Sequence, residues 1–107
     1  VQLLQVFQNL IQNAIKYNDK TEKIIDINYK VTEDFYLFSV KDNGIGIEEK
    51  YFEKIFRLFQ KLELNTEKDS IGIGLALVKK IINTMQGEIW LESRLGTGTT
   101  FYFTLPK

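Results

Sequence analysis

The spacing of apolar residues switches between helical and alternating patterns along the chain, and this order constrains the fold more than any other feature. Residues 3–17 place apolar side chains every three or four positions, which predicts a helix with one buried stripe: Leu3, Phe7, Leu10 and Ala14, flanked by Leu4, Ile11 and Ile15. Residues 24–31 and 35–42 alternate β-branched and aromatic residues with period two. The three residues between these two runs predict an antiparallel hairpin.

The second half of the chain repeats the two patterns. Helical spacing predicts helices at residues 48–59 and 75–85, the second ending near Gly87. The polar run at residues 60–70 predicts a mobile loop, and residues 88–93 and 99–105 predict two strands. The expected fold is one α+β domain over residues 1–107, a two-layer sandwich with helices on one face of a mixed, mostly antiparallel sheet.

Composition excludes several classes of function. The 107 residues include 14 basic and 14 acidic side chains, so no net charge attracts nucleic acid or an anionic membrane. The sequence has no cysteine and no histidine, which rules out disulfides, histidine-ligated zinc and a Ser-His-Asp triad. No apolar run reaches the ~20 residues of a membrane span, and neither a signal peptide nor direct membrane contact is expected. A cytoplasmic location is expected, which the absence of cysteine fits.

Three polar residues of the first helix form the first candidate site. Asn9, Asn13 and Lys16 fall on one line of the helix, roughly opposite the predicted apolar stripe. Asparagine is a poor helix former, so two asparagines on one line are not explained by helix stability. One interpretation is a solvated polar face. The other is a binding site in which an amide oxygen holds Mg²⁺ and Lys16 faces a phosphate.

Glycine-rich segments form the remaining candidates. Asp42 ends the second strand on the side predicted to be buried, and Gly44 and Gly46 follow it, so a flat adenine ring could approach and donate its amine to the carboxylate. Gly72 and Gly74 are expected just before a helix, where free N–H groups favour an anion. Residues 96–101 read most simply as a hairpin turn. Each segment alone is also compatible with an ordinary turn.

Taken in order, the segments NxxxNAxKY, DNGIGI, FEKIFRLF, GIGLAL and GTGTTF resemble the N box, first glycine box, F box, second glycine box and third glycine box of sensor histidine kinase catalytic domains, which have the Bergerat ATP-binding fold. The resemblance covers nearly the whole chain. It implies ATP and Mg²⁺ as ligands and transfer of the γ-phosphate to a histidine. It also implies as partners an upstream dimerisation and phosphoacceptor domain and a response-regulator receiver domain, in a homodimeric parent protein.

The resemblance assigns a role to each site residue. Asn13 would ligate Mg²⁺, with Asn9 and Lys16 near the phosphates and Tyr17 beside the adenine that Asp42 binds. Further contacts to the nucleotide or its lid are implied for Gly44, Gly46, Ile47, Phe56, Phe59, Gly72, Ile73, Gly74, Leu75 and Thr99.

The chain departs from the family pattern in three places. Ser70 replaces a glycine, which is expected to stiffen the lid, and Gln86 replaces another, which is expected to be harmless. The strand that usually precedes the first helix is missing from the sequence, so the sheet is expected to be one strand short.

Two alternative functions stay open. Gyrase, mismatch-repair and chaperone ATPases are similar in fold but carry a glutamate where this chain has Asn9, and an amide cannot act as a general base. A serine-directed kinase or ATPase of the same fold is one alternative. A degenerate, non-catalytic nucleotide-binding module is the other.

Overall fold

The computed structural model describes the backbone of residues 2–56 and 68–107, and the side chains of residues 2–56 and 75–107. The described residues form two helices and four strands, with two short 3₁₀ turns between them. In chain order the elements are α1 (Gln2–Lys16), β1 (Ile25–Val31), β2 (Phe35–Asp42), η1 (Glu49–Tyr51), η2 (Lys54–Phe56), α3 (Lys68–Thr84), β3 (Glu88–Arg94) and β4 (Gly98–Pro106).

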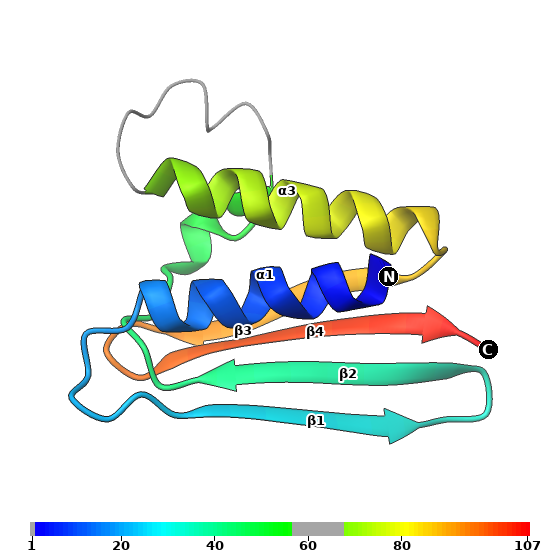
Figure 1. The fold of residues 1–107 in the computed structure, drawn as a ribbon, viewed down its shortest axis with the longest axis horizontal. Helices are drawn as coiled ribbons and strands as arrows, with labels where there is room; N and C mark the ends of the chain where they lie inside the picture. Colours follow the sequence, from blue (N-terminus) through cyan, green and yellow to red (C-terminus); the bar gives the residue numbers. More distant parts are fainter. Residues whose placement is uncertain (1, 57–67) are drawn as a thin grey trace.

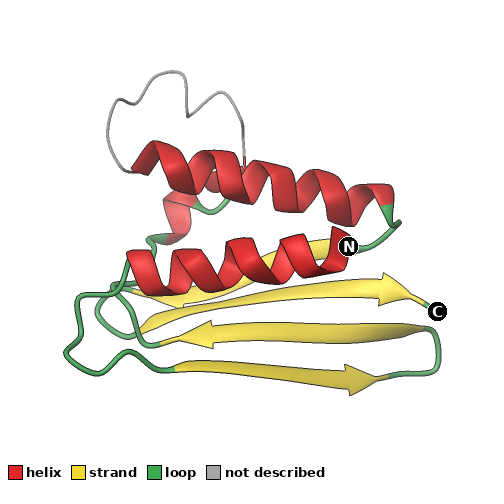
Figure 2. Ribbon diagram, in the orientation of Figure 1, coloured by secondary structure: helices red, strands yellow, loops and turns green. Residues whose placement is uncertain are grey.

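The elements form two layers, with α1 and α3 side by side on one face of the sheet (Figures 1 and 2). The described strands lie in the order β1-β2-β4-β3, and all three neighbouring pairs are antiparallel. The predicted sandwich and the predicted hairpin of β1 and β2 are therefore confirmed. Among the described residues, no helix combines the length and the apolar character needed to span a membrane.

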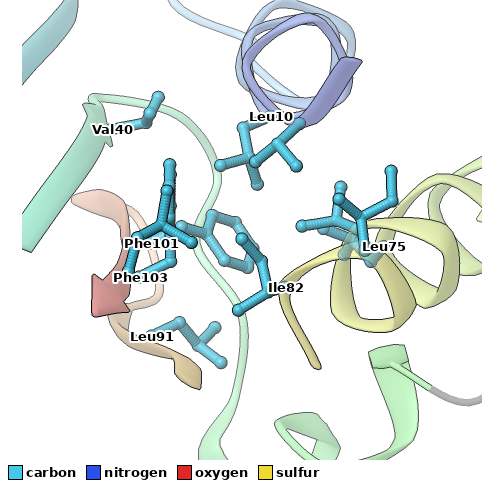
Figure 3. Packing of buried hydrophobic residues seen from close by; sticks show 11 residues of the cluster. Leu10, Val40, Leu75, Ile82, Leu91, Phe101 and Phe103 are labelled. Carbon is cyan, nitrogen blue, oxygen red and sulfur yellow. The ribbon is translucent and has the colours of Figure 1, made fainter. Parts of the chain in front are cut away.

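The core fills the space between the two layers (Figure 3). Phe103 of β4 is fully buried, and the ring of Phe7 from α1 packs edge-on against it with centroids 5.4 Å apart. Phe38 of β2 stacks on Phe103 from the neighbouring strand at 5.0 Å. The alternating apolar residues of β2 and β4 thus meet the helical stripes, as their spacing predicts, whereas Ile27, Tyr29 and Val31 of β1 are exposed. The other buried members include Val6, Leu10, Val40, Leu75, Val78, Ile82 and Leu91.

The buried stripe of α1 is rotated relative to the prediction. Val6, which was not assigned to the stripe, is fully buried, whereas the predicted flanking residues Leu4 and Ile15 are 61% and 50% exposed. The reason is tertiary: α3 packs beside α1 and covers the side of α1 that carries Val6. This rotation changes the environment of the two asparagines, as described below.

The helix predicted at residues 48–59 is wrong over its described part. Residues 48–56 contain only the two 3₁₀ turns η1 and η2. A helix this short is marginal without tertiary support. Here the tertiary contacts favour tighter turns, because Phe52, Ile55 and Phe56 all pack against the core.

The helix predicted at residues 75–85 begins earlier, at Lys68, so Gly72 and Gly74 lie inside α3 and not before it. Each glycine costs a helix only about 1 kcal/mol, which the rest of α3 can offset. The helix ends at Thr84, and Gln86 after it has a positive φ of 65°. Gln86 was expected to be a harmless replacement, yet it holds a left-handed backbone that favours glycine.

Candidate functional site

Three loops meet at one end of the sheet, at the left in Figure 1, and we call this meeting point the loop junction. The three are the loop after α1, the loop after β2, and the turn between β3 and β4. The amide of Ile45 donates to the carbonyl of Tyr17 at 3.2 Å, and the amide of Gly96 donates to the carbonyl of Ile45 at 2.8 Å. These backbone bonds bring together the first and third glycine boxes and the C-terminal end of α1.

Asn9 and Asn13 have buried amide nitrogens without a partner. The Nδ2 atom of each is inaccessible to solvent and has no hydrogen-bond partner among the described residues. On a helix, Asn13 lies about 20° and Asn9 about 60° from Val6, so both border the buried stripe. Asn9 and Asn13 are both partly exposed, so the solvated-face interpretation fails only for their amide nitrogens. A buried polar group without a partner costs about 1–3 kcal/mol, so these two nitrogens are candidates for contact with a ligand.

Lys16 and Tyr17 follow at the end of α1. Lys16 is exposed, with its ammonium 5.6 Å from the centroid of the Tyr17 ring, and Tyr17 is half-buried. The amide of Tyr17 bonds to the carbonyl of Asn13 at 3.1 Å, so Asn13 lies one helical turn before the loop junction. The structure thus brings Lys16, Tyr17 and the first glycine box to the same end of the molecule, whereas Asn9 lies in the middle of α1.

Asp42 ends β2 at this junction and is half-buried. Its Oδ1 accepts hydrogen bonds from the amides of Gly44 at 2.8 Å and Thr99 at 3.2 Å. Burial raises the pKa of Asp42 above 3.8, and the two amide hydrogen bonds and the charge of Lys20 partly oppose that rise. Asp42 therefore does stabilise the turn, through one oxygen. Both described bonds end on Oδ1, which leaves Oδ2 to accept from a ligand.

The glycines of the loops allow the backbone to pack closely within the protein. Gly46 has a φ of 80°, and a Cβ atom there would lie 2.2 Å from the carbonyl oxygen of Arg94. At Gly98 a Cβ atom would lie 2.0 Å from the carbonyl oxygen of Asp42. At Gly44 the nearest atom would be the Tyr17 carbonyl oxygen, at 2.7 Å. Contacts within the protein thus require glycine at these positions, independently of any ligand.

Ile47 and Thr99 are joined through Ser93. The amide of Ile47 donates to Ser93 Oγ at 2.7 Å, and the hydroxyls of Ser93 and Thr99 are also 2.7 Å apart. Thr99 is buried, and its amide is one of the two donors to Asp42. Ser93 was not predicted as a site residue.

The remaining predicted residues divide into packed residues and residues outside the described part. Phe56 packs edge-on against Phe101 with centroids 6.2 Å apart, which fixes η2 to the core. The side chain of Leu75 is buried in the core, so any phosphate contact there would involve its backbone. Gly72 and Ile73 lie in the α3 backbone with Gly74, and their side chains are not described. Phe59 and residues 60–67 of the lid predicted at 60–70 lie outside the described residues, and residues 68–70 belong to α3, so the loop prediction is wrong for them.

Three further residues of the junction were missed. Asn18 is buried and donates to Asn43 Oδ1 at 2.8 Å. Asn43 also accepts from the Ile24 amide and donates to the Glu22 carbonyl. Lys20 donates to the carbonyls of Gly44 at 3.3 Å and Gly96 at 3.1 Å. No local sequence pattern predicts hydrogen-bond partners so far apart along the chain, although Asn43 lies inside the DNGIGI motif.

The residues present fit Mg²⁺ bound together with phosphates. No group of three or more histidine, cysteine, aspartate or glutamate side chains suited to a metal occurs among the described residues. Mg²⁺ does not need such a group, since it takes one or two protein oxygens and completes its octahedron with water and substrate phosphates. Rotation about χ2 exchanges Oδ1 and Nδ2 of an asparagine, so Asn9 and Asn13 can present either an acceptor or a donor.

Comparison with known proteins identifies one family that matches the whole chain. The family described as histidine kinase-, DNA gyrase B-, and HSP90-like ATPase matches residues 1–107. Cyanobacterial phytochrome A from a Nostoc species is 51% identical over 105 residues, which cover 98% of this chain and 14% of that protein. Sensor histidine kinase WalK from Bacillus subtilis is 40% identical over 109 residues, covering 97% of this chain and 18% of that protein.

Among solved structures, the catalytic domain of histidine kinase ThkA in a nucleotide-free form superposes with a TM-score of 0.83 at 34% identity. The match covers 99% of this chain and 67% of that one. The chain thus spans about one seventh of the length of the phytochrome that it resembles, and most of the catalytic domain of ThkA.

Proposed function

Because the chain belongs to the histidine kinase-, DNA gyrase B-, and HSP90-like ATPase family, we propose that it is the ATP-binding catalytic domain of a sensor histidine kinase. The observation that carries this proposal is the pair of buried amide nitrogens of Asn9 and Asn13, which have no hydrogen-bond partner among the described residues. They lie on the helix that ends at the Asp42 junction. The sequence contains no histidine, so the phosphoacceptor would belong to another part of the parent protein.

Each residue of the site has a definite task in this proposal. Oδ2 of Asp42 accepts a hydrogen bond from the adenine amine, while Oδ1 stays bonded to the Gly44 and Thr99 amides. The amide oxygen of Asn13 holds Mg²⁺, which supplies neutralisation of phosphate charge when bound. Asn9 donates toward phosphate oxygens and Lys16 adds a positive charge nearby. Phosphoryl transfer needs little more than this positioning and charge stabilisation.

Asn9 favours transfer over hydrolysis. An amide has no basic site that could take a proton from water at neutral pH, so it cannot activate water as a glutamate would. The 107-residue chain is therefore expected to bind ATP and to hydrolyse it poorly.

The parent protein is proposed to supply the other components. These are an upstream dimerisation domain with the phosphoacceptor histidine, a homodimeric assembly, a response-regulator receiver domain as the next acceptor, and a cytoplasmic location for this domain. The relative named sensor histidine kinase WalK supports a parent protein with further domains, because this chain covers only 18% of it. The net charge of zero supports the absence of a nucleic-acid partner.

Calorimetric titration with a non-hydrolysable ATP analogue tests the proposal. We expect tight binding with Mg²⁺, weak binding in EDTA, and loss of this difference in Asn13→Ala. Gln12→Ala is the matched control, because it removes an exposed amide from the neighbouring position of the same helix. Equal affinities with and without Mg²⁺ in the parent chain would contradict the metal assignment. A large fall in the melting temperature of ligand-free Asn13→Ala would instead indicate a purely structural amide.

A further inference from the structure

The hydroxyl of Ser93 joins both sides of the loop junction. Ser93 is the penultimate residue of β3, followed by Arg94 and then the turn into β4. Its Oγ is 2.7 Å from the Ile47 amide nitrogen, 2.9 Å from the Gly98 carbonyl oxygen and 2.7 Å from Thr99 Oγ1. One side chain thus holds the loop after β2 and the start of β4 together.

These three contacts fix where the hydroxyl protons lie. The Ile47 amide can only donate to Ser93 Oγ, and the Gly98 carbonyl can only accept from it. The Ser93 hydroxyl therefore donates its single proton to the Gly98 carbonyl oxygen. The bond between the two hydroxyls must then be donated by Thr99, so Ser93 Oγ accepts two hydrogen bonds and donates one.

The start of β4 that Ser93 holds lies against Asp42. The Thr99 amide donates to Asp42 Oδ1 at 3.2 Å, and the α-carbon of Gly98 lies so close to the Asp42 carbonyl oxygen that a Cβ atom would approach it to 2.0 Å. A displacement of the segment Gly98–Thr99 would therefore change the position of the Asp42 carboxylate. Ser93 itself does not contact Asp42 among the described hydrogen bonds, so its effect on Asp42 passes through Thr99.

We propose that Ser93 is a positioning residue for recognition of the adenine base. By holding Gly98, Thr99 and Ile47 in place, it keeps Asp42 Oδ1 engaged with the Thr99 amide and directs Oδ2 toward the base amine. This inference rests on the proposed function, in which Asp42 binds adenine. It goes further in assigning base selectivity to a residue that need not touch the nucleotide.

The test measures the affinity of the 107-residue chain for ADP and GDP, in parallel with its melting temperature. Ser93→Ala is expected to weaken ADP binding about tenfold and to lower the ADP-to-GDP affinity ratio, because loss of the hydroxyl frees the Thr99 segment. Ser93→Thr keeps a hydroxyl and is expected to restore much of that ratio. Thr104→Val is the matched control, since Thr104 Oγ1 accepts from the Glu88 amide at the opposite end of the same strand pair. It should leave the ratio unchanged.

A double-mutant cycle separates the failure of this inference from the failure of the proposed function. If Asp42→Asn leaves ADP affinity unchanged, the adenine site itself is wrong. If Asp42→Asn weakens ADP binding but Ser93→Ala leaves the ADP-to-GDP ratio at the parent value, only the role of Ser93 is overturned. If Ser93 acts through Asp42, Ser93→Ala should have little further effect on the ratio in the Asp42→Asn background. Should Ser93→Ala fail to fold, Ser93→Cys keeps the shape while weakening the hydrogen bonds.

Discussion

Gly46 and Gly96 share a backbone φ of 80° but have opposite surroundings. A Cβ atom at Gly46 would lie 2.2 Å from the Arg94 carbonyl oxygen, whereas a Cβ atom at Gly96 would meet nothing within 4 Å. Gly96→Ala should therefore cost only the strain of the left-handed backbone, about 1 kcal/mol. Gly46→Ala adds a clash between two backbone segments and should cost about 3 kcal/mol or more. Urea unfolding of the two variants measures the difference directly. Equal losses of unfolding free energy would show that the close approach of residues 46 and 94 is not rigid.

Nucleotide affinity should depend on the protonation of Asp42. Burial raises the pKa of Asp42 above its ordinary value of 3.8. Only the carboxylate accepts a strong hydrogen bond from the adenine amine, so ADP affinity should fall as pH decreases through this raised pKa. Titrations across acidic pH, compared with Asp42→Asn, check this expectation. The variant should bind more weakly at neutral pH and lose this component of the pH dependence, and an unchanged profile would remove Asp42 from the base site.

Lowering the pH should weaken ADP binding through Asp42 but should increase the contribution of the same carboxyl group to folding stability. Because the pKa of Asp42 is higher in the folded than in the unfolded chain, the folded state holds the proton more tightly. The contribution of Asp42 to stability is therefore greatest below pH 3.8 and is lost as pH rises through the raised pKa. In ligand-free protein, Asp42→Asn should remove this component from the pH dependence of the unfolding free energy, although other carboxyl groups still contribute.

Gln86→Gly should stabilise the domain. Gln86 has a φ of 65°, and it is the only non-glycine residue with a positive φ in the described ranges 2–56 and 68–107. Glycine adopts this conformation without strain, so the substitution should raise the unfolding free energy by about 0.5–1 kcal/mol. Gly87→Ala is a suitable contrast, since its Cβ atom would approach the Thr104 carbonyl oxygen to 1.9 Å and should destabilise. A lower melting temperature for Gln86→Gly would contradict the strain argument.

Asn43→Ala should loosen the loop after α1. The Asn43 side chain accepts from Asn18 Nδ2 and from the Ile24 amide, and it donates to the Glu22 carbonyl. Since Asn18 is buried, its amide would lose a partner that solvent cannot readily replace, at a cost of about 1–3 kcal/mol. Hydrogen exchange at Ile24 should become faster, while exchange in β4 should change only as far as global stability falls. Unchanged exchange at Ile24 would show that this amide is not protected by Asn43.

The sequence predicted the strands better than the helices. Period-two alternation located β1, β2, β3 and β4 to within one residue at each end, because side-chain direction in a strand is fixed by the backbone. The helical pattern of residues 48–56 was misleading, since its apolar residues pack against the core from two 3₁₀ turns. The orientation of α1 was also misjudged, because burial of Val6 depends on a neighbouring helix that local spacing cannot reveal.

For the site, the order of the motifs predicted which segments form the loop junction. It did not predict the hydrogen bonds that hold these segments together. Asp42, Gly46 and Thr99 were predicted as contacts to a nucleotide, and the structure shows that each also bonds to or packs against another part of the protein. Ser93 and Asn18 were missed because their partners lie on other loops, and a single polar residue carries no periodic signal. The roles of Asn9 and Asn13 toward Mg²⁺ and phosphate remain predictions.

The position of β4 in the sheet has a consequence for biosynthesis. This strand, residues Gly98–Pro106, lies between β2 and β3 and carries the fully buried Phe103. During translation the β1–β2 hairpin can pair as soon as it emerges from the ribosome, whereas β3 has no strand to join until β4 follows it. The nascent domain must therefore keep much of its core uncovered until nearly all 107 residues are synthesised, and a ribosome that stalls before Phe103 would leave a chain for chaperones and proteases to recognise.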